Sequence, residues 1–126
     1  MTDVLISYAR ADTRLAARLA AGLEQLGLTV WWDIELPPGA DFERMIGERI
    51  TGATVVIVLW TPSSVASNWV RDEAGLALQH NKLIPIRVGA DPPLGFRSLH
   101  TLNMDNWQGE PLDAEALADI ARACGR

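Results

Sequence analysis

The sequence predicts an α/β domain built on a parallel sheet with helices on both faces. Apolar runs of strand length alternate with amphipathic segments of helix length along all 126 residues. The most apolar run, 54–60, shows no polar alternation, which is typical of a central strand buried on both faces. Nearly half of the residues are hydrophobic, enough for one domain with a real core. Together these observations predict a single domain over 1–126, possessing a flavodoxin-like, doubly wound sheet of five parallel strands.

The first half of the chain is expected to hold two strands and two helices. Residues 3–7 form a buried strand and 28–32 a second one, because both runs are short and apolar. Asp12 is placed to cap a helix over 13–26, which Gly27 ends. Asp41 opens a second helix through about residue 51. Residues 34–40 between them form a loop because Pro37-Pro38-Gly39 interrupts any regular structure.

The second half continues the alternation. The central strand 54–60 is followed by turn-forming residues and then by a helix from about 69 to 80. Residues 83–88 form a fourth strand, in which Pro85 indicates a position near an edge or a local bulge. The loop 89–98 leads to a weak fifth strand over 99–104. An amphipathic helix over 113–124 closes the domain.

Glu73 is the residue of the 69–80 helix that most needs an explanation. At about 100° per residue it falls inside the apolar arc, one turn after Trp69, whereas its neighbour Asp72 faces outward. A carboxylate that faces an apolar region costs several kcal/mol unless it is paired, hydrogen-bonded or lines a cavity. The carboxyl ends of the strands, where such folds bind ligands, converge on the first turn of this helix. Glu73 is therefore either a functional carboxylate or a partner in an ion pair with a nearby arginine.

Composition excludes several classes of protein. The net charge is −5 and no basic cluster follows a face, so nucleic acid is not an expected partner. The single cysteine excludes an internal disulfide and a cysteine zinc site and fits a reducing, cytoplasmic environment. Two separated histidines do not indicate a metal site. There is no signal peptide pattern and no apolar run near the roughly 20 residues of a membrane span.

Three motifs in order resemble those of a TIR (Toll/interleukin-1 receptor) domain. The first is Val4-Leu5-Ile6-Ser7-Tyr8, followed by Asp12. The second is Val30-Trp31-Trp32-Asp33 with Leu36, Pro38-Gly39 and Phe42, similar to the family's D-x-x-L-x-x-G-x-x-F loop. The third runs from Ser67 to Glu73 and resembles the W-x-x-x-E pattern of TIR domains that cleave NAD. The resemblance covers nearly the whole chain.

The resemblance implies an activity and a way of switching it on. It makes Glu73 the catalytic residue of an NAD⁺ nucleosidase, either a glycohydrolase or an ADP-ribosyl cyclase, with NAD⁺ as the substrate and no cofactor. It also implies that self-association completes the site through the loop from Asp33 to Phe42, so the expected interface residues are Leu36, Pro37, Pro38 and Gly39. A sensor domain in the same chain or complex is a further expected partner. The likeness is greatest to bacterial members, for which antiphage defence by NAD depletion is the corresponding role.

Other residues near the strand ends are candidates for contact with the substrate. Arg10 can pair with a phosphate, Tyr8 can stack on a ring, and the Tyr8–Ala9 backbone lies beside them. Trp31 and Trp32 point to opposite faces of a strand, and Trp32 is predicted to line the pocket. The full predicted set is Tyr8, Ala9, Arg10, Trp32, Asp33, Phe42, Ser64 and Trp69. Packing is the competing role for Phe42 and Trp69, and turn formation for Ser64.

Two other functions compete with the enzyme. A non-enzymatic TIR adaptor or signalling scaffold, or a host-mimicking effector, would have no need of a carboxylate at Glu73. A phosphoacceptor receiver domain shares the fold but needs an acidic pair after the first strand and an aspartate after the third. Those positions read Ser7-Tyr8 and Trp60-Thr61, which sets the receiver aside. No glycine-rich phosphate-binding motif follows the first strand.

Overall fold

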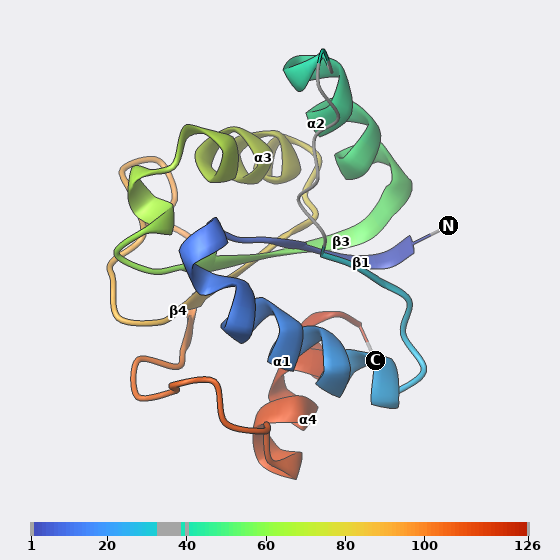
Figure 1. Cartoon of the computed structure of the whole chain (residues 1–126), viewed down its shortest axis with the longest axis vertical. Coiled ribbons are helices and arrows are strands. Elements are labelled where there is room, and N and C mark those ends of the chain that lie inside the picture. Colours follow the sequence, from blue (N-terminus) through green and yellow to red (C-terminus); the bar gives the residue numbers. More distant parts are fainter. Residues whose placement is uncertain (1, 33–38, 40, 126) are drawn as a thin grey trace.

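A computed structural model describes residues 2–32, 39 and 41–125 (Figure 1). Within these residues, five parallel strands form one sheet in the order β2-β1-β3-β4-β5. The strands are β1 (Thr2–Ser7), β2 (Val30–Trp31), β3 (Ala53–Trp60), β4 (Leu83–Arg87) and β5 (Leu102–Asn103). The predicted parallel, doubly wound sheet is confirmed. Apart from Gly39, the loop predicted over 34–40 lies outside the described residues.

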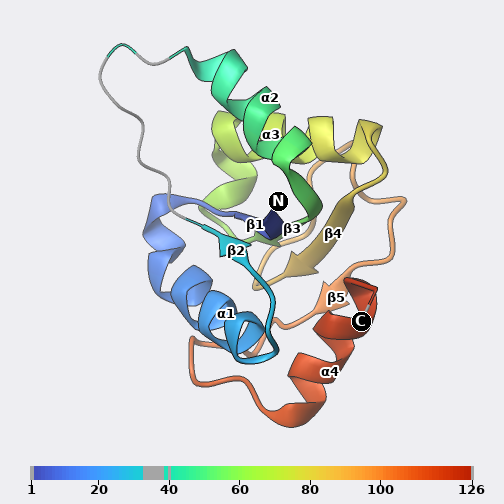
Figure 2. The same cartoon turned by 90° about the vertical axis from the view of Figure 1, so that its right-hand side faces the viewer.

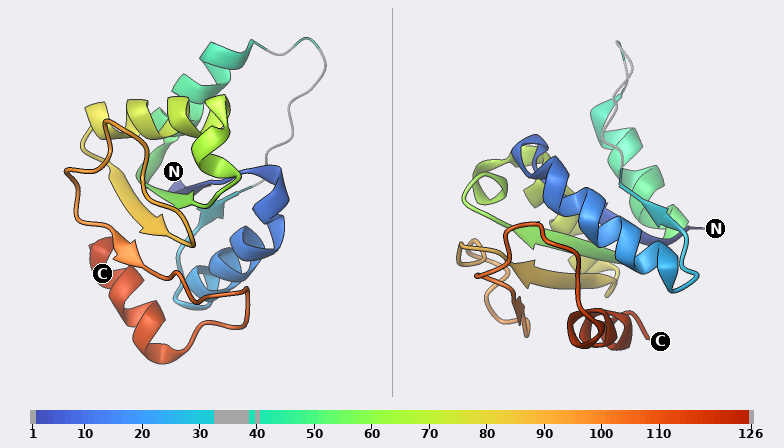
Figure 3. Two further views of the ribbon diagram at one scale, coloured as in Figure 1. Left: turned by 90° about the vertical axis from the view of Figure 1, so that its left-hand side faces the viewer. Right: turned by 60° about the horizontal axis from the view of Figure 1, so that its bottom comes forward.

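Helices cover both faces of this sheet, as predicted. The helices α1 (Thr13–Gln25) and α4 (Ala114–Ala123) lie on one face, and α2 (Phe42–Gly52) and α3 (Asn68–Gln79) on the other (Figures 1 and 2). Figure 3 shows the sheet between the two helical layers. Short 3₁₀ turns, Arg10–Asp12 and Ser64–Ala66, precede α1 and α3. Within the described part of the chain, none of the helices combines the length and the hydrophobicity that a membrane span requires.

Strand β3 is the centre of the core, as its unbroken apolar run indicates. Its residues alternate between the two helical layers. Ile57 and Leu59 pack in the cluster under α1 and α4, and Val58 and Trp60 pack under α3. All four are fully buried. Burying a side chain of this size contributes about 1.5–3 kcal/mol, so β3 anchors both layers at once.

Pro85 sits in β4 without a bulge. The register between β3 and β4 is continuous, and Pro85 pairs with Val58. On its other side β4 pairs with β5 only through Ile86 and Arg87. Pro85 therefore lies one residue before the first pair between β4 and β5. The prediction of a position near an edge is confirmed, and the alternative of a bulge is wrong.

Both edge strands are shorter than expected. Only Val30 and Trp31 of the predicted 28–32 run pair with β1. Leu28 belongs instead to the end of the preceding helix, where its N–H donates to the carbonyl of Leu23 at 3.2 Å. A strand at an edge has a ladder on one side only, so local turns compete with it successfully.

The structure confirms the predicted helix cap at Asp41 and adds one at Ser67. The Asp41 carboxylate accepts a hydrogen bond from Arg44 N–H at 3.2 Å, and Ser67 Oγ accepts one from Val70 N–H at 3.3 Å. Asp12 occupies the N-cap position of α1, as predicted, but its side chain makes no capping hydrogen bond. The Asp12 carboxylate instead accepts a hydrogen bond from Thr61 Oγ1 at 2.5 Å, which ties the loop after β1 to the loop after β3.

Candidate functional site

Glu73 points into the protein, as its place in the apolar arc predicts. Its side chain is fully buried, while Asp72 is exposed. Both of its carboxylate oxygens are bound. Ser7 Oγ donates to Oε1 at 3.0 Å, and Arg49 Nε donates to Oε2 at 2.8 Å. The hydrogen bond and the ion pair offset the free-energy cost of burying this carboxylate.

The two partners come from different elements of the same face. Ser7 is the last residue of β1, two residues after Leu5, which packs against α2. Arg49 lies on α2, three residues after the buried Ile46, and is 3% exposed. The Arg49–Glu73 salt bridge is therefore a buried one, for which loss of either partner leaves an uncompensated charge.

The guanidinium group of Arg49 lies over two indole rings. Its central carbon lies 4.7 Å from the ring centroid of Trp31 and 5.7 Å from that of Trp69. Both distances fit cation–π contacts. Trp69 and Glu73 are four residues apart on α3, so they share one face of the helix. We call Ser7, Trp31, Arg49, Trp69 and Glu73 the Glu73 cluster.

The two adjacent tryptophans lie on opposite sides of the sheet, as alternation predicts. Trp31 packs toward α2 and α3, in the Glu73 cluster. Trp32 packs in the cluster under α1 and α4, with its ring 6.3 Å from that of Tyr8. The tryptophan beside Glu73 is thus Trp31, whereas the sequence analysis chose Trp32. The register decides this, because Trp31 pairs with Leu5 and shares its face.

The other residues proposed for substrate contact are more dispersed. Tyr8 is 4% exposed and lies within the core, so it is not the solvated loop residue that served as its alternative role. Ala9 is half-buried and Arg10 is exposed. Trp69 is half-buried beside Arg49. Burial and position alone do not test whether these residues contact a substrate. Substrate contact stays a prediction for each of them.

Ser64 has the geometry of a turn residue. It is fully buried. Its hydroxyl donates to the carbonyl of Leu59 at 2.6 Å and accepts from Thr61 N–H at 2.8 Å. This arrangement favours turn formation, the role weighed against substrate contact.

Part of the predicted interface lies outside the described residues. This holds for Asp33, Leu36, Pro37 and Pro38, and for the side chain of Phe42. Gly39 is exposed and has a φ of +79°, a backbone conformation that glycine adopts without strain. The glycine of the D-x-x-L-x-x-G-x-x-F pattern is therefore explained by its local conformation.

Sequence reasoning missed Ser7 and Arg49 as site residues. Arg49 follows Met45 and Ile46 by four and three residues, so it falls on the apolar face of its helix. This is the signal that identified Glu73, applied to a charge of the opposite sign. Two opposite charges on the buried faces of neighbouring helices predict a pair. Ser7 carried no comparable signal, because a serine at a strand end is common.

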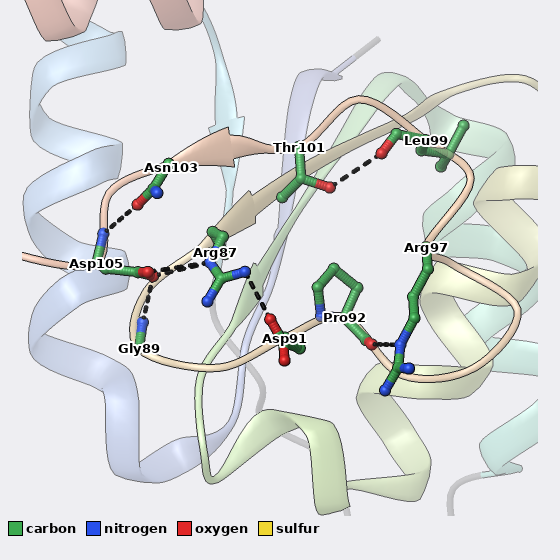
Figure 4. Close-up of polar contacts among 9 residues, drawn as sticks. All are labelled: Arg87, Gly89, Asp91, Pro92, Arg97, Leu99, Thr101, Asn103 and Asp105. Atoms are coloured by element: carbon green, nitrogen blue, oxygen red, sulfur yellow. Dashed lines mark hydrogen bonds and ion pairs between the residues drawn. The ribbon is translucent and has the colours of Figure 1, made fainter.

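A second polar cluster lies at the carboxyl ends of β4 and β5 (Figure 4). Arg87 donates from Nε to Asp105 at 3.0 Å and from Nη1 to Asp91 at 2.7 Å, and Gly89 N–H donates to Asp105 at 2.8 Å. The hydrogen bond from Arg87 and that from Gly89 lower the pKa of Asp105 below its ordinary value. The same carboxylates raise the pKa of Arg87. These bonds fasten the segment after β5 to the end of β4.

Next to this cluster is an open groove of about 490 Å³. Its lining residues are Arg87, Asp91, Pro92, Arg97, Leu99, Thr101 and Asn103. The Nε of Arg97 donates to the carbonyl of Pro92 at 2.8 Å, which fixes the side chain along one wall. Among the described residues, no group of three or more His, Cys, Asp or Glu side chains is arranged to hold a metal ion.

Comparisons with known proteins agree with this architecture. The family model described as TIR domain matches residues 4–120. No curated protein matches the chain. The TIR domain of the Toll-related receptor TRR-2 from Hydra magnipapillata is 23% identical, with full coverage of both chains and a TM-score of 0.83.

Two further solved structures share the fold. A metazoan TIR-STING receptor from C. gigas is 24% identical over 98% of this chain and 40% of the receptor, with a TM-score of 0.73. The TIR domains of the activated Roq1 resistosome, which directly recognises the pathogen effector XopQ, are 15% identical. That alignment covers 98% of this chain and 99% of the other, with a TM-score of 0.70. At these identities the similarity establishes the fold.

Proposed function

This chain belongs to the TIR domain family, and from that premise we propose that it is an NAD⁺ nucleosidase. In this proposal it cleaves the bond between nicotinamide and ribose, and Glu73 is the catalytic residue. NAD⁺ is the substrate and no cofactor takes part. The products are nicotinamide and either ADP-ribose or a cyclised ADP-ribose.

The observation that carries the proposal is the Glu73 carboxylate at the ligand-binding edge of the sheet. Glu73 is fully buried, yet its partner Ser7 is the last residue of β1. The carboxyl ends of parallel strands are where doubly wound folds bind ligands. Glu73 also stands four residues after Trp69, in the W-x-x-x-E spacing of TIR domains that cleave NAD. A charged group in such a place is a functional-site candidate on physical grounds.

The chemistry requires only one carboxylate. The nicotinamide of NAD⁺ is already a pyridinium cation, so it leaves with the electron pair of the broken bond and needs no proton. Ordinary glycosides require a second carboxylic acid for that purpose. As the bond breaks, positive charge develops at the anomeric carbon, and a fixed carboxylate stabilises it. Water, or an internal nucleophile on the same dinucleotide, then forms the new bond to that carbon. A proton carried by the attacking group, as in water, is released to the solvent.

We propose that residues in the loops at the carboxyl ends of the strands make the remaining contacts with the substrate. Exposed Arg10 would bind a phosphate, beside Tyr8 and Ala9. Trp69 would form a wall next to Glu73, and Asp33 and Phe42 would contribute from the loop before α2. Trp32 and Ser64 complete the predicted set. Trp31 joins it on structural grounds, because it lies beside Arg49 in the Glu73 cluster.

Self-association is the proposed switch for this activity. Leu36, Pro37, Pro38 and Gly39 would form the contact between protomers. The TIR domains of the Roq1 resistosome support this, since a resistosome is an assembly. A cytoplasmic location, a sensor domain as partner and a role in antiphage defence by NAD depletion belong to the same proposal.

One observation favours a second function, that of a non-enzymatic adaptor or scaffold. Both oxygens of Glu73 are bound within the protein, and the salt bridge to Arg49 is a satisfied buried pair. A structural glutamate would have this geometry. In that case the domain would act only through contacts with other TIR domains.

The two functions are separated by NAD⁺ consumption. We expect the purified wild-type domain, crowded on beads, to release nicotinamide, and Glu73→Ala to release none. The matched control is Asp72→Ala, which removes the adjacent but exposed carboxylate of the same helix and should keep the activity. Chromatography of the products distinguishes hydrolysis from cyclisation. Equal activity in the wild type and Glu73→Ala would exclude Glu73 as the catalytic residue.

A further inference from the structure

Glu73 is closed off from any substrate in this structure. Its side chain has no exposed surface, and one of its two carboxylate oxygens is bound by a guanidinium nitrogen at 2.8 Å. A carboxylate that stabilises a developing positive charge must lie beside that charge. A catalytic Glu73 therefore requires that one of its bound groups move away before it can act.

Arg49 is the group whose chemistry resembles what Glu73 is proposed to meet. It is a cation, it binds Oε2, and it contacts the indole rings of Trp31 and Trp69. The positive charge of Arg49 therefore already lies next to the carboxylate. Ser7, in contrast, is a neutral donor that binds the opposite oxygen. Ser7 orients the carboxylate without competing for the position of a cation.

We propose that Arg49 is an internal latch that keeps the Glu73 site closed by occupying the position of the substrate's positive charge. This inference rests on the proposed NAD⁺-cleaving role of Glu73 and adds its regulation. The latch is specific to arginine, because a planar guanidinium both stacks on indole faces and donates to a carboxylate. A lysine at this position keeps the charge but is strongly hydrated and stacks poorly.

The latch makes the competent state a minor one. When only a fraction of the molecules is open, the apparent activity is the activity of the open state multiplied by that fraction. Weakening the latch raises the open fraction without any change in the reacting groups. Substituting Arg49 should therefore increase activity in dilute protein, whereas a purely structural arginine would give decreased or unchanged activity.

The test compares Arg49→Lys and Arg49→Gln with the wild type in dilute solution. We expect Arg49→Lys, whose strongly hydrated ammonium group stacks poorly on the indole rings, to fold and to cleave NAD⁺ about tenfold faster than the wild type. The matched control is Arg44→Lys, the same change on the exposed side of the same helix, where the arginine side chain is 76% exposed. This control should leave activity unchanged. Cooperative thermal unfolding of each variant establishes that it is folded.

A second measurement reports the latch without relying on activity. A water-soluble carbodiimide with an amine nucleophile labels accessible carboxylates, and mass spectrometry locates the label. Glu73 should remain unlabelled in the wild type and in Arg44→Lys, and become labelled in Arg49→Lys and Arg49→Gln. If the label reaches Glu73 in these variants while no form cleaves NAD⁺, the latch stands and the proposed activity fails. If the clustered wild type cleaves NAD⁺ but Arg49 variants show neither labelling nor increased activity, the latch is overturned.

Discussion

The Arg49–Glu73 salt bridge should show a large coupling free energy in a double-mutant cycle. The two side chains are 3% and 0% exposed and meet at 2.8 Å. Removing one partner of such a pair costs about 3–5 kcal/mol, because the other charge stays buried without compensation. That loss is a large part of the roughly 5–15 kcal/mol that stabilises a typical domain.

The cycle consists of Arg49→Met, Glu73→Leu and the double variant. Each single variant should unfold at a much lower urea concentration than the wild type. The double variant removes both charges of the pair, so its free energy of unfolding should lie within about 1 kcal/mol of the wild-type value or above it. The expected coupling free energy is therefore at least about 3 kcal/mol. Far-UV circular dichroism is the suitable signal, since Trp31 and Trp69 adjoin the mutated groups and would disturb fluorescence.

The exposed pair Arg44–Glu48 on the same helix is the matched control. Its atoms meet at a similar distance, 3.0 Å, but the side chains are 76% and 61% exposed. An exposed pair four residues apart contributes only about 0.3–0.5 kcal/mol. A coupling free energy for Arg49 and Glu73 no larger than that of the control pair would refute the assignment of a buried, energetically coupled salt bridge.

Three further predictions concern hydrogen bonds in the loops and at a helix cap. The pKa of Asp105 is lowered in the folded state by Arg87 and by Gly89 N–H, so its stabilising effect is present above the ordinary value of 3.8 and lost as the pH falls through the lower folded value. Asp105→Asn should flatten the decline of stability in this acidic range, measured by urea unfolding at several pH values, and an unchanged acid profile would contradict it. Thr61→Val should lower the unfolding free energy by about 1.5–3 kcal/mol, since it removes the hydrogen bond to the Asp12 carboxylate, and the change in the urea midpoint measures this. Ser67→Ala should cost about 1 kcal/mol by removing the cap of α3, whereas no shift of the thermal midpoint would show that the cap contributes nothing.

The sequence predicts the fold well because its apolar runs of strand length and its amphipathic segments of helix length are both clear. The run 54–60 has no polar interruption and becomes the central strand β3, buried against both helical layers. The edge strands are predicted less well. Hydrophobicity marks 28–32 as strand, but at an edge the end of α1 competes for Leu28 and only two residues pair with β1.

The candidate site is predictable where the signal lies within one element. Glu73 is identified by its angle on a helix. Arg49 was missed, although the same argument applied to its own helix would have identified it. The choice between Trp31 and Trp32 depends instead on the register of β2 against β1, which no local pattern encodes. The side chain of Asp12 likewise bonds with Thr61, a residue 49 positions away, and local capping rules do not include such contacts.

The most direct test of the central claim is nicotinamide release per folded molecule by Glu73→Gln. Glutamine keeps the shape and hydrogen-bonding ability of the side chain but lacks its charge, and it leaves the Arg49 charge buried without its partner. The folded fraction must therefore be measured by circular dichroism at the assay temperature, and the released nicotinamide divided by it. We predict that the clustered wild type releases nicotinamide and that Glu73→Gln, corrected in this way, releases none above background. Release by folded Glu73→Gln at the wild-type rate would contradict the catalytic role of Glu73.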